Sequence, residues 1–145
     1  MPRVIYVNVD EPMKARIAQE WGELAARHMH LADGFSIVAL AAEQPVGLIA
    51  VAYRGLPAPL VGTYEGYIDI IEVHPAYRQQ GIATQLIAMV IERLRAQHLY
   101  QVRAWSSDDK TVAIRLWKTL GFTLCPAMIY PRGLGVQGYF VAKLL

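Results

Sequence analysis

The spacing of apolar residues predicts strands and helices along the whole chain. Runs rich in β-branched and aromatic residues indicate about seven strands, and apolar positions recurring every three or four residues indicate three or four helices. The strands are expected at residues 3–9, 35–42, 46–53, 64–73, 101–106, 122–129 and 135–144. The helices are expected after Asp10, over 82–97 and over 111–120. The polar residues 107–110 introduce the last of these helices, and the Ser and Asp residues among them are expected to supply its N-cap. Because tight turns join some strands and helices separate others, the pattern predicts one mixed, mostly antiparallel α/β sheet.

The first half of the chain contains a helix, a hairpin and a loop. Asp10 and Pro12 are favoured at an N-cap and in a first helical turn. The inner face of this helix is expected to carry Ile17, Trp21, Leu24 and His28. Residues 43–45 predict the turn between the next two strands. The segment 55–62 is rich in Pro and Gly, so we expect a loop there, and we expect it to form the rim of a substrate site.

A short basic turn centred on Gly81 joins the strand 64–73 to the next helix. Helical spacing begins at Ile82, so Gly81 lies where the first N–H groups of a helix have no partner. Such groups bind anions, above all phosphate. Arg78 adds positive charge, and the small residues Gly81 and Ala83 let an oxygen approach the backbone closely. The pattern Arg-x-x-Gly-x-Ala matches neither the Rossmann nor the Walker loop, and by itself it also fits an ordinary strand-to-helix turn.

Two motifs in chain order resemble the GNAT superfamily of acyl-CoA-dependent N-acyltransferases. Val73-His74-Pro75 followed by residues 78–83 is similar to the family's Arg/Gln-x-x-Gly-x-Gly/Ala motif after a strand ending near Val-x-Pro. Residues 113–122 are similar to its Ala-x-x-Leu-Tyr-x-x-x-Gly-Phe helix and strand. The resemblance covers most of the chain and is specific between about residues 69 and 122. It implies a GNAT fold with a splayed central parallel pair, in a single N-acetyltransferase domain over residues 1–145.

The resemblance also implies an acetyl-CoA site around the turn. The pantetheine arm would bond to the backbone of Ile71, Glu72 and Val73, and the Val73 N–H would face the oxyanion. Arg78 and the Thr84 hydroxyl would assist the backbone N–H groups that hold the pyrophosphate. Those groups belong to Gln79, Gln80, Gly81, Ile82, Ala83 and Thr84.

The second motif departs from the family at two positions. Trp117 occupies the place where the family often has a Tyr that protonates the leaving thiolate. Because an indole N–H cannot act as that acid, we expect Trp117 to form a wall of the cofactor groove. The acid stays open between Tyr130, Tyr139 and water. Lys110 stands where the family usually has an Asn that touches the cofactor, and it is either a phosphate contact or a solvated lysine.

Carboxylates on the strand 64–73 are the candidates for binding or deprotonating the amine. Simple alternation of side chains predicts Tyr67, Asp69, Ile71 and Val73 on one face and Ile68, Ile70 and Glu72 on the other. Asp69 is the first candidate because family members place an acidic group near this point, and Glu72 is the second. Asp69 could instead pair with a neighbouring Arg. A carboxylate of ordinary pKa is a poor base for an ammonium, so attraction of the amine is the main expected role.

Composition narrows the class of protein. The chain has 145 residues, 54% of them hydrophobic, which suffices for the core of one domain. The net charge of +2, without clusters of Lys and Arg, disfavours nucleic acid as a partner. No apolar run approaches the roughly 18 residues that a membrane span needs. With no signal peptide before the first strand, the cytoplasm is the expected compartment.

The cysteine and the histidines are the remaining candidates for chemistry. Cys125 is the single cysteine and is expected to be a small core residue. The four histidines lack metal-ligand spacing, so no metal is expected. His28 and His30, with Trp21, fall in the family's acceptor-side region, where they either line a pocket or cap the first helix.

The expected activity is transfer of an acetyl group from acetyl-CoA, as acyl-donor substrate, to a primary amine of a small molecule or a protein. The amine would attack directly in a ternary complex, and a homodimer is an open alternative to a monomer. A non-catalytic CoA-binding or CoA-sensing domain is the runner-up, and release of free CoA separates the two. An unrelated nucleotide-binding α/β domain is the third reading, which a preference for ATP over CoA would favour.

Overall fold

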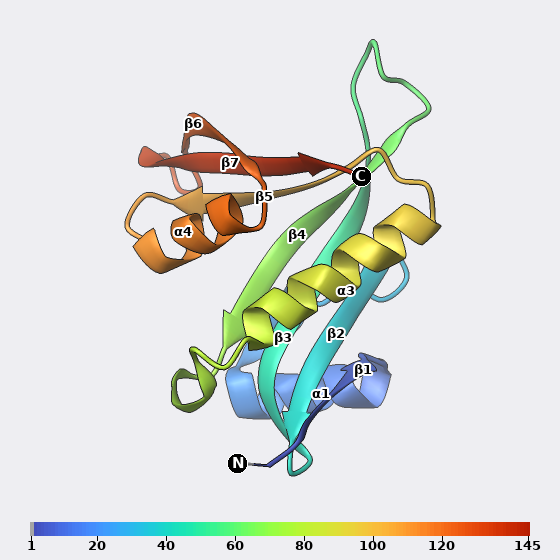
Figure 1. Cartoon of the computed structure of the whole chain (residues 1–145), viewed down its shortest axis with the longest axis vertical. Coiled ribbons are helices and arrows are strands. Elements are labelled where there is room, and N and C mark those ends of the chain that lie inside the picture. The colour runs from blue at the N-terminus through green and yellow to red at the C-terminus, as the bar shows by residue number, and fades with distance from the viewer. Residues whose placement is uncertain (1) are drawn as a thin grey trace.

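The structure is a computed structural model that describes residues 2–145, and its central element is a seven-stranded sheet (Figure 1). The elements are β1 Val4–Asn8, α1 Glu11–Trp21, α2 Glu23–Arg27, β2 Gly34–Ala41, β3 Gln44–Gly55, β4 Tyr64–Val73, the 3-10 turn η1 Pro75–Tyr77, α3 Ile82–Ala96, β5 Gln101–Ser107, α4 Thr111–Thr119, β6 Thr123–Ile129 and β7 Val136–Leu144. No helix within residues 2–145 combines the length and apolar character needed to cross a bilayer.

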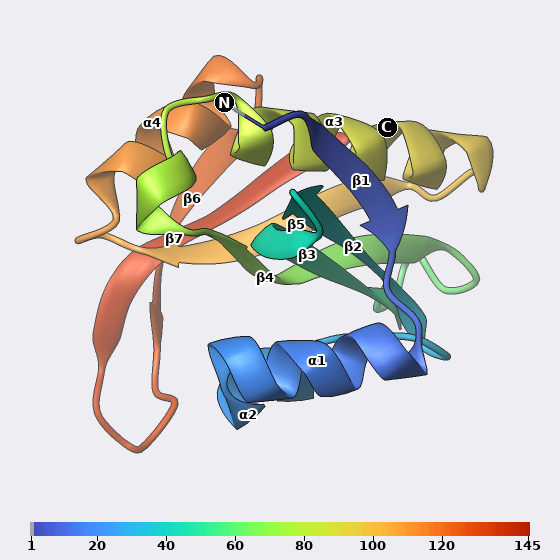
Figure 2. The same cartoon turned by 90° about the horizontal axis from the view of Figure 1, so that it is seen from below.

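The sheet has the strand order β1-β2-β3-β4-β5-β7-β6. The β4–β5 pair is parallel, and all other neighbours are antiparallel. Figure 2 shows α1 and α2 on one face of the sheet and α3 and α4 on the other. The predicted fold class, a mixed and mostly antiparallel sheet with one central parallel pair, is confirmed.

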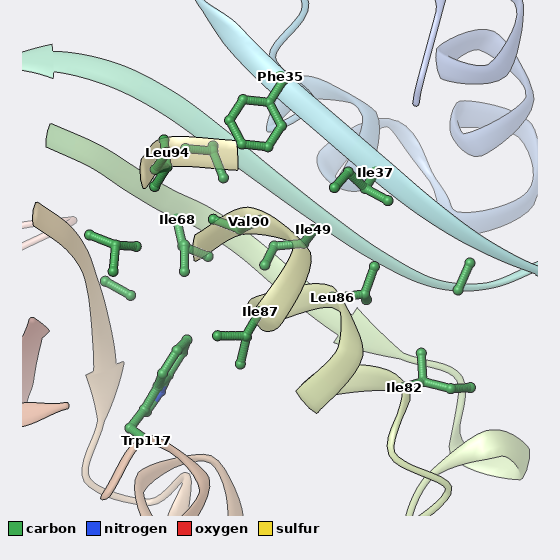
Figure 3. Close-up of a cluster of buried hydrophobic side chains, with 14 of the residues drawn as sticks. Phe35, Ile37, Ile49, Ile68, Ile82, Leu86, Ile87, Val90, Leu94 and Trp117 are labelled. Atoms are coloured by element: carbon green, nitrogen blue, oxygen red, sulfur yellow. The ribbon is translucent and has the colours of Figure 1, made fainter. Parts of the chain in front are cut away.

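Helix α3 fixes the position of β4. Its buried residues are Ile82, Leu86, Ile87, Val90 and Leu94, which recur at helical spacing. They pack on apolar side chains of β2, β3 and β4 in the main core cluster (Figure 3). A Cβ on Gly66 would lie 2.5 Å from Leu94 Cδ1, so a larger residue there would force the buried Leu94 side chain to shift. Each fully buried Leu or Ile contributes about 1.5–3 kcal/mol, which makes α3 a rigid support for the turn before it.

The hairpin turn between β2 and β3 lies slightly earlier than predicted. Its two residues are Ala42 and Glu43, with φ of 48° and 65°, whereas the sequence pattern indicated residues 43–45. Two left-handed residues match the right-handed twist of the strands that they join. The strand β3 therefore begins at Gln44.

The first helical segment consists of two helices, and Gly22 separates them. The Asp10 side chain caps α1 as predicted. Gly22, with φ of 97°, ends α1, and α2 begins in a new phase. The predicted inner face is therefore wrong beyond Trp21, because Leu24 is 67% exposed. The residues of α2 that are buried instead are Ala25 and Ala26.

The loop between β3 and β4 does not border the turn that carries the anion motif. It joins Gly55 to Tyr64, at the start of β4, whereas η1 follows the end of β4 (Figure 1). Ten residues of extended strand, about 33 Å, lie between them. The loop therefore lies at the opposite end of β4 from the anion motif, and its role as the rim of a substrate site stays a prediction.

Candidate active site

The central parallel pair separates partway along β4. Residues 65–68 of β4 pair with residues 101–104 of β5, and the ladder ends at Ile68 and Ala104. Beyond that point β4 keeps its pairing with β3, and β5 keeps its pairing with β7. Figure 1 shows the two strands diverging, β4 toward η1 and β5 toward α4. This split is the predicted splay, and among the described strands nothing covers the freed edge of β4 from Asp69 onward.

The backbone of Ile71 and Val73 faces the split. The His74 N–H donates to the Val46 carbonyl at 2.8 Å, so these two residues form a hydrogen-bonded pair at the end of the β3–β4 ladder. Residues along an antiparallel ladder alternate between pointing their N–H and C=O at the partner strand and away from it. Val73 and Ile71 therefore point theirs away from β3, and Glu72 points its own toward β3. The structure thus disagrees with the expectation that the Glu72 backbone is free for the pantetheine arm.

The turn after β4 ends in an uncapped helix N-terminus. The chain passes through η1 to Gly81, which has φ of 80°, and α3 starts at Ile82. The first N–H groups of α3 have no intrahelical carbonyl partner, and no side chain caps them. A Cβ on Gly81 would meet no atom within 4 Å, so glycine is required here by the left-handed backbone rather than by crowding. Arg78 Nε donates to the Val73 carbonyl at 3.0 Å, which ties the turn to the end of β4.

Asp69 lies at a β-bulge that changes which side chains share a face. Ile68 pairs with Val51 and Ile70 pairs with Ala50, so Asp69 is the extra residue on β4. As a consequence Ile68 and Ile71 both contribute to the core under α3, while Ile70 packs on the α1–α2 side. The predicted alternation is therefore wrong. Asp69 and Glu72 both lie on the α1–α2 side, since Asp69 contacts His30 and Glu72 pairs with Leu48 of the core on that side.

The Asp69 carboxylate is bonded to a histidine rather than to an arginine. Asp69 Oδ2 lies 2.8 Å from His30 Nε2, and His30 Nδ1 lies 3.0 Å from both oxygens of Asp33. The hydrogen bond from His30 lowers the pKa of the Asp33 carboxyl below its ordinary value. His28 has a different role, because its Nδ1 lies 2.8 Å from the Leu24 carbonyl at the end of α2. Of the two alternatives for this region, His28 serves the helix end and His30 reaches the candidate site.

A buried ion pair, which sequence reasoning missed, lies four residues before Asp69 on β4. Glu65 is 1% exposed and accepts hydrogen bonds from Arg103 Nη2 at 2.6 Å and Gln101 Nε2 at 2.7 Å. Burial pushes the pKa of Glu65 upward, but the bonds from Arg103 and Gln101 outweigh it, and the pKa lies below its ordinary value. The pair results from the register of the parallel strands, which places Glu65 beside Gln101, and no sequence signal could have revealed it.

Tyr67 lies between two arginines on the same side of the sheet. The guanidinium of Arg54 is 3.8 Å from the centre of its ring, and that of Arg103 is 4.9 Å away. Burial raises the pKa of the Tyr67 hydroxyl, and this effect exceeds the opposing influence of the two arginines. Tyr67 therefore adds a neutral hydroxyl to the α1–α2 side of β4.

Trp117 lies in the core rather than at the surface. It is 2% exposed, its ring centre lies 4.8 Å from that of Phe122, and its Nε1 donates to Ser106 Oγ at 3.2 Å. Figure 3 shows Trp117 near Ile87 of α3. The indole N–H is therefore committed to a protein partner.

The other sequence candidates are more exposed. Lys110 stands at the N-cap of α4 with no side-chain capping bond, so the N-cap role expected for the preceding Ser and Asp residues is wrong; Ser107 bonds to Asp109 instead. Cys125 is exposed on β6, and the expectation of a core cysteine is wrong. Tyr139 packs against the core under α3, whereas Tyr130 is 64% exposed. Within residues 2–145, no three His, Cys, Asp or Glu side chains are grouped to hold a metal ion.

The split parallel pair leads through a glycine turn into an uncapped helix, so a freed strand edge lies next to a group of unpartnered backbone N–H groups. The chain belongs to the Acetyltransferase (GNAT) family, whose model matches residues 5–122. The N-alpha-acetyltransferase 30 of Saccharomyces cerevisiae is 28% identical over 57 residues, which cover 39% of this chain and 32% of the yeast protein. The chain thus matches about a third of the length of that relative.

Solved structures share the fold along their whole length. Arabidopsis thaliana NAA60 in complex with acetyl-CoA superposes with a TM-score of 0.82 at 16% identity, covering 99% of this chain and 100% of the other. The ribosomal-protein-S18-alanine N-acetyltransferase of Escherichia coli gives a TM-score of 0.75 at 16% identity, covering 98% and 94%. At these identities the likeness establishes the fold.

Proposed function

We propose that the protein transfers an acetyl group from acetyl-CoA to a primary amine by direct attack in a ternary complex. One observation carries this proposal: the split between β4 and β5 continues, through a single short turn, into the uncapped N-terminus of α3. An extended thioester with a pyrophosphate fits this arrangement, because the freed edge of β4 offers backbone hydrogen bonds and the helix end offers N–H groups to an anion.

The cofactor side is assigned to the turn and to the freed edge of β4. The pyrophosphate would bind the N–H groups of residues 79–84, with Arg78 and Thr84 beside them. The pantetheine arm would bond to the N–H and C=O of Ile71, which face the split, and to the Val73 carbonyl, which has a second lone pair beside its bond from Arg78. The Val73 N–H is the candidate donor to the oxyanion that develops on the thioester carbonyl.

Acetyl transfer forms a C–N bond between the amine nitrogen and the acetyl carbon and breaks the C–S bond, with CoA thiolate as the leaving group. The amine must enter as a free base, so its ammonium form loses one proton before or during attack. Asp69 is the candidate group that attracts the ammonium and receives or passes on this proton. It lies beside the split, on the side away from α3, and its side chain is 26% exposed.

Peptide α-amines are the first acceptors to test. The yeast relative is named an N-alpha-acetyltransferase, and Arabidopsis thaliana Naa50 was solved in complex with the bisubstrate analogue CoA-Ac-MVNAL. Small primary amines form the second group. Release of free CoA from acetyl-CoA, measured across a library of both groups, tests the function itself.

Asp69→Asn tests the assigned carboxylate. We expect kcat/KM for the amine to fall by about tenfold or more, with the acetyl-CoA Kd from calorimetry unchanged, because the substitution removes charge on the acceptor side only. Glu72→Gln is the matched control, since Glu72 is an exposed carboxylate on the same strand and the same side. If Glu72→Gln lowers the rate and Asp69→Asn does not, the assignment moves to Glu72.

A CoA-binding domain without catalysis is the second candidate, and the environment of Trp117 favours it. The family often has a Tyr here as acid, whereas this chain has a buried indole whose N–H is bonded to Ser106. Tight binding of acetyl-CoA without CoA release for any amine in the library would support this second function.

A further inference from the structure

His30 is held at the candidate site by its own backbone. Its N–H donates to Ser36 Oγ at 2.9 Å, and Ser36 Oγ donates to the His30 carbonyl at 2.9 Å. Ser36 is 2% exposed on β2, a strand that is buried along its whole length. The segment between α2 and β2 is therefore fixed to the sheet at His30, so the position of the imidazole is determined by the fold.

The imidazole joins two carboxylates from distant parts of the chain. His30 Nε2 faces Asp69 Oδ2 at 2.8 Å and Nδ1 faces the Asp33 carboxylate at 3.0 Å, with the His30 side chain 16% exposed. Only the imidazolium has an N–H on each nitrogen, so only that form donates to both carboxylates at once. A neutral ring keeps one bond and places a lone pair opposite the other carboxylate. Asp33 thus holds the ring in the orientation in which Nε2 faces Asp69.

We propose that His30 is a positioning residue that holds the Asp69 carboxylate for the acceptor amine, with Asp33 orienting the ring. The bond to Oδ2 fixes the torsion of the Asp69 side chain. Among residues 2–145, no second side-chain hydrogen bond to Asp69 is present, so Oδ1 is available to an incoming ammonium. The inference rests on the proposed function, since it gives Asp69 the acceptor-side role described above.

Other charged groups around His30 do not replace either carboxylate. Lys14 of α1 acts on Asp33 through its charge. Asp10, Glu11 and Arg93 line a cavity of about 360 Å³ together with His30. Asp10 caps α1 and Arg93 bonds to Asn8, so these two side chains have partners of their own.

A matched pair of substitutions separates positioning from packing. The amide nitrogen of Gln reaches about as far as Nε2 of His, and that of Asn only about as far as Nδ1. We expect His30→Asn to lower kcat/KM for the amine by about ten- to a hundredfold, because a misplaced reacting group costs that much, while the acetyl-CoA Kd stays constant. His30→Gln should retain most of the activity. Wild-type kcat/KM in His30→Asn, or an equal loss in both variants at equal thermal stability, would overturn the proposal.

A double-mutant cycle with Asp69 tests whether His30 acts through that carboxylate. We expect His30→Asn to have little further effect in the Asp69→Asn background, since the group that it positions is already changed. An undiminished loss there means that His30 acts independently, and it overturns the proposal. If Asp69→Asn alone has no effect, the acceptor-side role of Asp69 fails and the inference fails with it. If Asp69→Asn is impaired and His30→Asn is not, the inference fails alone.

A spectroscopic measurement covers the case in which no amine is acetylated. Replacing Asp69 by Asn should move the ¹⁵N resonance of His30 Nε2 and leave those of His28 and His98 in place. An unchanged His30 resonance overturns the contact itself. A moved resonance in a protein without CoA release keeps the contact and rejects the proposed function.

Discussion

A substitution at Trp117 tests whether this buried aromatic residue, which stands where the family often has a Tyr, serves packing or takes part in acetyl transfer. The perturbation is Trp117→Phe, which removes the indole N–H and part of the ring. The side chain is 2% exposed, packs on Phe122 and donates to Ser106 Oγ. If its role is packing, the substitution lowers stability and leaves acetyl-CoA binding and turnover close to wild type.

The magnitude follows from two losses. The hydrogen bond to Ser106 contributes about 0.5–1.5 kcal/mol to the free energy of unfolding. The smaller ring loses about 1–2 kcal/mol of buried apolar contact and leaves a small void. We therefore expect the free energy of unfolding to fall by about 2–3 kcal/mol, which lowers Tm by roughly 5–10 °C for a chain of this length.

Chemical denaturation measures the stability change, and steady-state release of CoA below Tm measures turnover. Trp117→Tyr serves as a comparison, since its hydroxyl restores the residue that the family often has here. A stable Trp117→Phe variant with normal acetyl-CoA affinity and a large loss of kcat would refute the packing account. It would mean that the indole orients the thioester or the acceptor.

Three further predictions concern the turn at Gly81, Lys110 at the start of α4, and the buried ion pair of Glu65 and Arg103. Gly81→Asp should raise the acetyl-CoA Kd at least tenfold. The control is Gly62→Asp, at a glycine that also has a positive φ and open space around it, and it should leave the Kd unchanged. Unaltered affinity in a folded Gly81→Asp variant places the site elsewhere. Lys110→Ala should weaken acetyl-CoA binding more at low salt than at high salt if the lysine contacts a phosphate, and calorimetry at two ionic strengths decides between this and a solvated lysine. Glu65→Gln should lower the free energy of unfolding by about 2 kcal/mol at neutral pH, since it weakens a hydrogen bond between charged groups to Arg103. The pKa of Glu65 is lower in the folded than in the unfolded state, so its contribution to stability is present above the unfolded pKa and is lost as pH falls through the folded pKa. The difference in stability between wild type and Glu65→Gln should therefore narrow in acid. A difference that stays constant with pH contradicts the ion pair's proposed contribution.

Local sequence was sufficient to predict most strands and helices and the glycine turn at Gly81. The strand over residues 64–73 and the helix that follows it were predicted from apolar spacing, and Gly81 was placed at the helix start, because these features depend on neighbours within a few residues. The splayed parallel pair was implied only by resemblance to a family. The apolar pattern also gave wrong predictions at two irregularities of the backbone. Gly22 ends one helix and starts another with a different buried face, and the bulge at Asp69 shifts the alternation of side chains along β4.

The tertiary structure alone decided which side chains meet around Asp69. His30 and Asp69 are 39 residues apart in the chain and 2.8 Å apart in space, and no sequence pattern favours this pair over a pair of Asp69 with an arginine. Likewise Glu65 meets Arg103 only through the register of two parallel strands joined by a helix. Apolar periodicity determines which faces are buried, and it therefore excludes a one-residue slip between strands but not a slip of two residues. It carries no information on where a loop crosses a sheet. The exact register and the path of the loop set the contacts of the polar groups in the candidate site.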